Sequence, residues 1–182
     1  MLLLGSSSQT RASILRAYGI DFVQKRCEFD EDALEYSLPK DFVYHAAMGK
    51  LKACEARYGL GMPILCADTV VTADGEILRK AVDAKDAKEM LMKQSGKSVS
   101  IITCTAYKSK SKMFVDLSET VYQFLPFDEK DLNRYIDSGE WRGKAGACMV
   151  EGFCKPYIKS VRGYESCAMG LSVEKLKPWL EG

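Results

Sequence analysis

Carboxylates, cations and hydroxyls that could act together on a polyphosphate are spread along this chain. Asp68 interrupts the apolar run 64–71, where a carboxylate either satisfies hydrogen bonds at a kink or serves chemistry. Carboxylates hold divalent cations and accept protons from water, while cations and amide N–H groups hold polyphosphates. This mixture predicts cleavage of a phosphoanhydride bond, and the candidate residues are Ser6, Ser8, Arg11, Glu31, Lys50, Asp68, Lys80 and Lys144.

The N-terminal segment predicts an anion-binding loop. Residues 2–4 are typical of a short buried strand, and Gly5 with the serines after it leads into a helix predicted over 9–18 and capped by Ser8. The first N–H groups of a helix lack partners, so they and the helix dipole favour an anion in this loop, beside Arg11. The alternative is a serine-rich cap with a solvated arginine.

The other candidates lie on elements that apolar patterns and turn signals delimit. Lys50 is predicted within a helix, and Glu31 lies in an acidic loop of a kind that is often only solvated. Asp68 lies in a buried strand that turns at Asp74-Gly75 into a hairpin ending before Lys80. The further predicted elements are strands 21–27, 76–78, 99–107, 113–124 and 157–161, helices 40–57, 83–94 and 128–138, the last two capped by Asp83 and Asp128, and a final helix after Ser172 interrupted by Pro178.

Length and charge narrow the classes of function. The chain has 182 residues, enough for one domain or for one domain with two lobes. Lys and Arg total 26 against 25 Asp and Glu, so charge gives no general attraction to nucleic acid or to anionic membranes. We therefore expect neither as a partner, and any basic site must be local. The apolar run at the N-terminus is too short for a signal peptide or a membrane span.

The cysteines and the single histidine argue against structural metal sites. The seven cysteines form no C-x-x-C pair and are odd in number, which disfavours a disulfide framework and a zinc ribbon. We expect mostly buried thiols in a reducing cytoplasm. His45 has no second histidine to share a metal, so we expect it to be a surface or packing residue.

Motifs along the chain resemble those of the Maf family, in matching order from residue 2 to the final helix. They are Ser6-Ser7-Ser8-Gln9-Thr10-Arg11, Phe29-Asp30-Glu31, Lys50, Ala67-Asp68-Thr69-Val70-Val71, Asp74-Gly75-Glu76-Ile77-Leu78-Arg79-Lys80, Lys144-Ala145-Gly146-Ala147 and Gly170-Leu171. The resemblance implies a single domain over 1–182 with an α/β fold of the inosine-triphosphatase type. In that fold a long, bent mixed sheet flanked by helices forms two lobes around a central cleft.

The resemblance also implies an activity and roles for residues. Family members are cytoplasmic nucleoside triphosphate pyrophosphatases, also named as inhibitors of septum formation. Asp68 would accept the proton of the attacking water with Lys50 and Lys80 as catalytic partners, and Glu31 with Asp68 would hold Mg²⁺ or another divalent cation such as Mn²⁺. The nucleoside triphosphate, modified nucleotides included, would be bound by Ser6, Ser8, Thr10, Arg11, Thr69, Lys144 and Glu151. A homodimer is left open.

Departures from the family pattern leave the preferred base open. Thr10 stands where one subgroup, specific for thymidine and uridine triphosphates, has arginine, whereas Thr69 keeps that subgroup's residue. Glu151 stands where that subgroup has glutamine and where the subgroup for 7-methylguanosine triphosphate has glutamate. A carboxylate only accepts hydrogen bonds, so Glu151 suits a base edge rich in donors, such as that of guanine. Gly49 replaces the usual glutamate before Lys50, a change that we interpret as structural.

Two readings from other classes compete with the enzyme. One is a non-catalytic regulator of cell division that binds nucleotide or a protein partner. The other is a nucleic-acid-binding protein, which the near-zero net charge and the lack of an aromatic and basic stripe disfavour.

Overall fold

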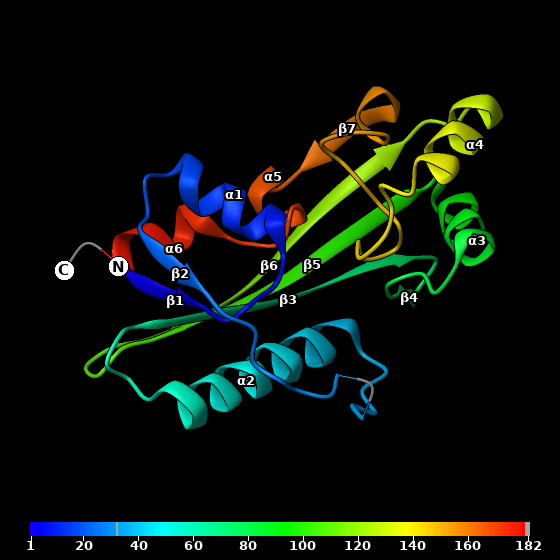
Figure 1. Cartoon of the computed structure of the whole chain (residues 1–182). Helices are drawn as coiled ribbons and strands as arrows, with labels where there is room; N and C mark the ends of the chain where they lie inside the picture. Colours follow the sequence, from blue (N-terminus) through cyan, green and yellow to red (C-terminus); the bar gives the residue numbers. More distant parts are fainter. Residues whose placement is uncertain (32, 181–182) are drawn as a thin grey trace. The chain divides into compact units, whose positions relative to one another are not determined.

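The computed structural model describes residues 1–31 and 33–180. Within them, seven strands form one mixed sheet in the order β2-β1-β3-β5-β6-β7, with β4 paired to β3 (Figure 1). Strand β1 runs parallel to both β2 and β3, whereas the pairs β3–β4 and β6–β7 are antiparallel. This mixed sheet with flanking helices confirms the predicted α/β class.

The elements follow the order that the sequence predicts. The strands are β1 (Leu2–Leu4), β2 (Phe22–Gln24), β3 (Ile64–Ala73), β4 (Glu76–Leu78), β5 (Ser98–Lys108), β6 (Met113–Phe124) and β7 (Ile158–Arg162). The helices are α1 (Gln9–Ala17), α2 (Pro39–Tyr58), α3 (Ala84–Gln94), α4 (Glu129–Ser138), α5 (Glu165–Ala168) and α6 (Val173–Leu180), with a 3-10 turn at Lys155–Tyr157.

The chain forms two compact units. The first contains Met1–Thr69, Thr103–Ser118 and the segment that begins at Gly170, and the second contains Val70–Ile102 and Glu119–Met169. Strands β3, β5 and β6 each contribute residues to both units.

In the first unit, helices cover both faces of the strands. Helices α1 and α6 lie on one side and α2 lies on the other (Figure 1). One stripe of α2 is buried, at Val43, Ala47, Leu51 and Cys54. Ser8 caps α1, as predicted, because its Oγ accepts the N–H of Arg11 at 3.3 Å. This cap fixes the point at which the serine loop enters the helix.

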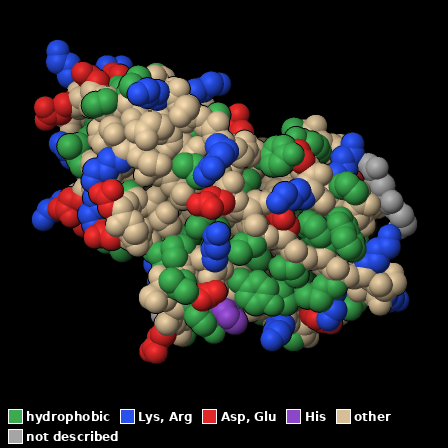
Figure 2. All heavy atoms as spheres, turned by 180° about the vertical axis from the view of Figure 1, so that it is seen from behind, with side chains coloured by type: hydrophobic (Ala, Val, Ile, Leu, Met, Phe, Trp, Pro, Cys, Tyr) green, Lys and Arg blue, Asp and Glu red, His purple; other side chains and the backbone are tan. Residues whose placement is uncertain are grey.

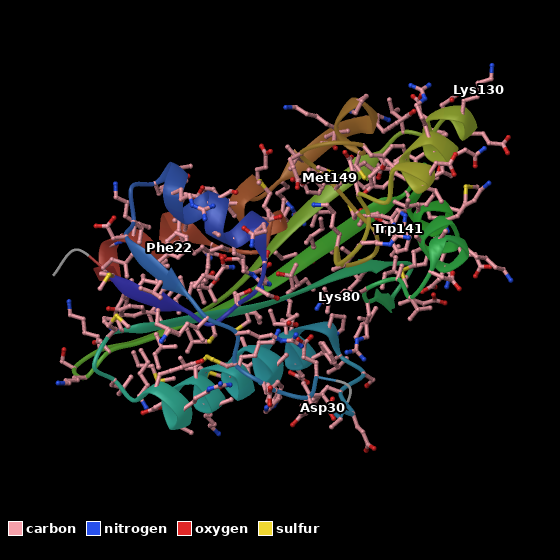
Figure 3. All side chains as sticks on the ribbon, viewed as in Figure 1. Phe22, Asp30, Lys80, Lys130, Trp141 and Met149 are labelled. Atoms are coloured by element: carbon pink, nitrogen blue, oxygen red, sulfur yellow. A yellow bond between two sulfur atoms is a disulfide. The ribbon has the colours of Figure 1, made fainter. Side chains whose placement is uncertain are left out.

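The second unit has two apolar clusters. One contains residues of strands β3 to β6 and of the loop between α4 and β7. Its buried members are Val71, Ala73, Leu78, Val99, Ile101, Tyr122, Phe124, Val150 and Cys154. The other joins α3 and α4 around the buried Trp141 (Figure 3). Asp83 and Asp128 cap these helices through their side chains, as predicted. Asp74 and Gly75, both at positive φ, form the predicted hairpin turn between β3 and β4.

Most predicted elements agree with the structure to within one residue at each end, and two differ in a way that packing explains. The strand predicted over 21–27 covers only Phe22–Gln24, the residues that pair with β1. The final helix is not interrupted at Pro178 but includes it. Proline inside a helix costs about 3 kcal/mol. Here Leu176, before the proline, is fully buried, and the ring of Trp179, after it, has its centroid 5.2 Å from that of Phe114. Packing therefore holds the helix before and after Pro178.

Most of the cysteines are free thiols, as predicted, and one pair is the exception. Cys27 and Cys54 form a disulfide, with their Cα atoms 5.3 Å apart. Sequence spacing does not indicate it, because α2 and the segment that follows β2 meet only in the folded chain. The free cysteines are Cys66, Cys104, Cys148, Cys154 and Cys167. Among the described residues, no helix combines the length and apolar composition needed to cross a membrane.

Candidate functional site

A charged cluster of Glu31, Lys50 and Asp68 lies in the first unit, where α2 faces β3. Lys50 Nζ is 2.6 Å from Asp68 Oδ1 and 2.7 Å from Glu31 Oε1. The side chains of Lys50 and Asp68 are only 13% and 6% exposed, so water and salt screen their attraction weakly. The structure therefore brings together three of the predicted site residues, from segments that are distant in sequence.

Asp68 presents one oxygen that has no partner. Its Oδ1 is paired with Lys50, whereas its Oδ2 is buried and accepts no hydrogen bond from any described residue. A buried carboxylate oxygen without a donor is costly. Oδ2 is thus available to bind a cation or to accept the proton of a water molecule. The alternative, in which Asp68 only accepts hydrogen bonds at a kink of the strand, does not explain an oxygen that accepts none.

Arg11 joins three separate parts of the first unit. Its Nε donates to Gly170 O at 2.8 Å, its Nη1 to Ser6 Oγ at 3.1 Å and its Nη2 to Thr69 Oγ1 at 3.1 Å. Burial lowers the pKa of the guanidinium, and the carboxylates of the charged cluster counteract this by favouring the charged form. A guanidinium has five N–H groups, so two remain beyond these three bonds. Arg11 is therefore fixed by the protein and still able to donate.

The serine loop between β1 and α1 has the form of an anion site. Ser8 N donates to Ser6 Oγ at 3.2 Å, and Gln24 Nε2 donates to the carbonyl oxygens of Ser6 and Ser8 at 2.8 and 3.2 Å. These bonds hold the loop at the N-terminus of α1, where the helix dipole favours negative charge. Thr10, in the first turn of α1, is partly buried.

A buried hydroxyl fixes Thr69. Thr69 Oγ1 accepts the N–H of Arg11 and lies 2.8 Å from the Oγ1 of Thr103, which has no exposed surface. Gly170, at φ 104°, leaves room for this contact, because a Cβ there would lie 3.3 Å from both Arg11 Nε and Thr69 Oγ1. The residue that follows Asp68 is thus held on two sides.

An aromatic contact anchors the segment that carries Glu31. The ring of Phe29 lies against Gly49 of α2 so closely that a Cβ on Gly49 would come within 2.2 Å of it. Asp30, the residue between Phe29 and Glu31, is labelled in Figure 3 and lies near α2. Gly49, where the family pattern has glutamate, is accordingly structural: any side chain there would displace the ring.

The second unit carries the other predicted residues. Lys80, labelled in Figure 3, is exposed and forms an isolated antiparallel bridge with Ala145. Next to that bridge, Lys144 Nζ lies 3.2 Å from Glu151 Oε1. Gly146 has a φ of 59°, and a Cβ on it would lie 2.9 Å from a side chain of β3, so glycine is required there. This unit therefore groups Lys80, Lys144 and Glu151 around one short loop.

Some residues that build the site carry no signal in the sequence. Gln24 and Thr103 lie in strands and look like ordinary polar positions, but pairing of the strands places them behind the serine loop and behind Thr69. They could have been found only by knowing the strand order β2-β1-β3-β5.

The donor set suits a hard divalent cation. Mg²⁺ is typically bound by one or two carboxylates together with water and phosphate oxygens. Glu31 and the unpartnered Oδ2 of Asp68 match that pattern. Among the described residues, no group of three or more histidine, cysteine or carboxylate side chains is arranged to hold a metal ion.

Known proteins resemble this chain along its whole length. Residues 1–182 match the family model described as Maf-like protein. The chain is 57% identical over 178 residues to a nucleoside triphosphate pyrophosphatase of Nitratiruptor sp., an alignment that covers 97% of this chain and 96% of that protein. It is 38% identical over 175 residues to a protein of the same name from Helicobacter pylori, covering 96% and 92%. For Campylobacter jejuni the identity is 36% over 183 residues, covering 99% and 100%.

One solved structure gives the fold an independent comparison. The Staphylococcus aureus Ham1 protein is similar with a TM-score of 0.56, covering 100% of this chain and 98% of that one. The two sequences are only 10% identical, so the likeness concerns the fold alone. It confirms the predicted architecture of the inosine-triphosphatase type.

Proposed function

Because the chain belongs to the Maf family, we propose that it is a nucleoside triphosphate pyrophosphatase that hydrolyses the bond between the α- and β-phosphates. The products are a nucleoside monophosphate and pyrophosphate. Relatives between 36% and 57% identical bear this name, which supports the proposal. Modified nucleotides are among the candidate substrates.

The observation that carries the proposal is the buried, unpartnered Oδ2 of Asp68 beside a lysine held by two carboxylates. A purely structural ion pair would have its remaining lone pairs satisfied by neighbouring donors. An oxygen kept without a donor, on a carboxylate that is paired with Lys50, suits a site whose missing partner is substrate, water or metal.

In the proposed reaction, Asp68 accepts a proton from the water that attacks the α-phosphorus. Lys50 orients the Asp68 carboxylate through its bond to Oδ1. The free N–H groups of Arg11 and the amides of the serine loop hold phosphate oxygens. The family pattern assigns Lys80 and Lys144 to the same triphosphate, where they would stabilise the charge that builds on the departing pyrophosphate.

Glu31 and Asp68 would hold Mg²⁺ or Mn²⁺, which when bound offsets negative charge on the phosphate oxygens. Support comes from the hard oxygen donors and from the lack of a hydrogen-bond donor at Asp68 Oδ2 among the described residues. Chelation with EDTA should abolish hydrolysis, and adding Mg²⁺ in excess of the chelator should restore it.

The base is proposed to meet Glu151, whose carboxylate is already paired with Lys144. A carboxylate accepts hydrogen bonds and cannot donate them, so it favours a base edge with N–H donors. Thr69 keeps the residue of the pyrimidine subgroup, yet its hydroxyl is occupied by Arg11 and Thr103. We therefore give Glu151 more weight and expect guanine-type triphosphates to be cleaved better than thymidine triphosphate.

The test is to incubate purified protein with a panel of nucleoside triphosphates and Mg²⁺ and to quantify every product. Monophosphate and pyrophosphate in equal amounts are expected. Orthophosphate as the first product would rule out the proposed bond. Glu151→Gln should shift the preference toward pyrimidine triphosphates without changing the products.

The proposal includes a cytoplasmic location and a part in septum formation, both implied by the family. A non-catalytic regulator remains the competing reading, and Asp68→Asn separates the two. If overproduction of the protein arrests division, a binding role should survive this substitution, whereas a role that needs hydrolysis should not.

A nucleic-acid partner is not proposed, because positive and negative side chains are interspersed on the face drawn in Figure 2. Whether the enzyme is a homodimer is answered by light scattering.

A further inference from the structure

Three cysteines form a sulfur layer, which we define as Cys27, Cys54 and Cys66, in the first unit. Cys27 and Cys54 are joined by a disulfide, and the Sγ of Cys66 lies 3.8 Å from that of Cys54. A Cβ on Gly5 would lie 2.5 Å from Cys54 Sγ and 2.6 Å from Cys66 Sγ. The sulfurs therefore pack directly against the backbone that leads into the serine loop.

The sulfur layer and the charged cluster belong to the same three segments. Glu31 lies four residues after Cys27, and Lys50 lies four residues, about one helical turn, before Cys54. Asp68 lies two residues after Cys66 and so on the same face of β3. Wherever two of these segments meet, a sulfur contact accompanies an ion pair: Cys54 with Cys66 beside Lys50 with Asp68, and Cys27 with Cys54 beside Glu31 with Lys50.

Several contacts, including the stacking of the Tyr36 ring on His45, hold the segment that carries Glu31 against α2. Between β2 and α2, the described residues form neither helix nor strand. The close contact of Phe29 with Gly49 and the ion pair of Glu31 with Lys50 hold this segment to α2, and the disulfide adds a covalent tie at its start. Such a tie restricts the conformations of the segment, so breaking it should let the segment open more often.

We propose that Cys27, Cys54 and Cys66 form a reversible thiol–disulfide site, in which the bond between Cys27 and Cys54 fixes the segment bearing Glu31 beside Lys50. Reduction consumes a dithiol: its two S–H groups become a disulfide, and their two electrons and two protons convert the bond into the Cys27 and Cys54 thiols. Oxidation by a low-molecular-weight disulfide reverses these steps, with two molecules of thiol as the product.

The burial of the sulfurs sets the direction of attack. Cys27 is 9% exposed, whereas Cys54 and Cys66 have no exposed surface. We therefore expect a reductant to attack at Cys27, the less buried residue of the pair, forming the mixed disulfide there and releasing Cys54. Cys66 fills the space beside Cys54 as a thiol, so the native pairing is Cys27 with Cys54. The second unit offers a comparison: Cys148 and Cys154 have their sulfurs 3.7 Å apart and are both free.

The disulfide and its effect on the segment that carries Glu31 are independent of the proposed function. The test uses the full chain equilibrated with glutathione disulfide or with dithiothreitol. Free thiols are trapped with N-ethylmaleimide in denaturant, and peptides are mapped by mass spectrometry. In the oxidised sample we expect one linked peptide pair, joining Cys27 to Cys54, with Cys148 and Cys154 alkylated.

Hydrogen exchange of the peptides over residues 28–38 then measures the consequence. We expect exchange there to be at least fivefold faster in the reduced protein than in the oxidised protein, with α3 and α4 unchanged. Cys27→Ser should exchange fast in both conditions, and Cys104→Ser, a buried cysteine outside the layer, should behave as the wild type. If Cys27→Ser does not fold, the comparison of oxidised and reduced wild type decides alone.

Either of two results would overturn the inference: alkylation of Cys27 and Cys54 in the oxidised sample, or equal exchange of residues 28–38 in both states. A bond between Cys54 and Cys66 instead would refute the assigned pairing. Nucleotide hydrolysis is assayed on the same samples. Loss of hydrolysis in both states would count against the proposed function, while the peptide map would still judge the disulfide.

Discussion

Replacing Asp68 by asparagine should remove catalysis while leaving the fold in place. The substitution keeps the shape of the side chain but gives an amide that cannot take a proton from water. A positioned general base contributes about 10²- to 10⁴-fold to rate, equivalent to about 2.7–5.4 kcal/mol of transition-state stabilisation. Because Asp68 is also a proposed metal ligand, we expect kcat to fall by at least about 10³-fold, toward the upper part of that range.

The cost in stability should be much smaller. Removing one partner of a buried ion pair costs about 3–5 kcal/mol when the other charge is left alone. Here Lys50 keeps Glu31 at 2.7 Å, and the asparagine carbonyl can still accept its N–H. We therefore expect a loss below about 2 kcal/mol, or a decrease in Tm of less than about 8 °C for a chain of this size.

The assay is pyrophosphate release with saturating Mg²⁺, alongside a thermal melt and binding of a non-hydrolysable triphosphate analogue. Asp137→Asn, the same change at an exposed position of α4, is the matched control and should keep full activity. The reasoning fails if folded Asp68→Asn retains more than a tenth of wild-type kcat. It also fails if the variant is inactive only because it has unfolded.

Three further predictions concern the supports of the site. Gly49→Ala should raise the Mg²⁺ concentration for half-maximal rate, because the new Cβ must displace the Phe29 ring, 2.2 Å away. The Tm should change little, because a helix-propensity gain of about 1 kcal/mol offsets part of an overpacking cost of about 1–3 kcal/mol. An unchanged dependence of the rate on Mg²⁺ would count against the contact of Phe29 with Gly49 as an anchor. Thr103→Val removes the hydroxyl 2.8 Å from that of Thr69, a hydrogen bond worth about 1 kcal/mol, so kcat/KM should fall about fivefold. Thr103→Ser should retain activity, and equal rates in both variants would contradict a positioning role. Burial raises the pKa of the Cys104 thiol to about 12, so only about one molecule in 10⁴ has the Cys104 thiolate at pH 8. Iodoacetamide should therefore leave Cys104 of the native protein unmodified at this pH, as mass spectrometry of the peptides would show. Rapid labelling of Cys104 would show that it is accessible.

Local chemistry made much of the fold predictable. Ser8, Asp83 and Asp128 each cap the helix that the sequence assigned to them, because capping is decided by a side chain and the N–H groups within three residues. The hairpin at Asp74-Gly75 was predictable for the same reason. The end of β2 and the helix at Glu165–Ala168 were not, since pairing partners and packing set them rather than their own residues.

The sequence identified the residues of the charged cluster as candidates but did not predict their contacts. The pattern pointed to Glu31, Lys50 and Asp68, yet the contacts that join them exist only once α2 lies against β3. The disulfide between Cys27 and Cys54 is the clearest failure, because spacing rules detect cysteines that are close in sequence. That Arg11 donates three bonds to the protein was equally invisible, because two of its acceptors lie far along the chain.

Hydrolysis in water enriched in ¹⁸O tests the central claim most directly, because the isotope marks the phosphorus that water attacks. With attack on the α-phosphorus assisted by Asp68, one ¹⁸O atom should appear in the nucleoside monophosphate and none in the pyrophosphate, as read by mass spectrometry. Isotope in the pyrophosphate, or in orthophosphate released first, would contradict the account.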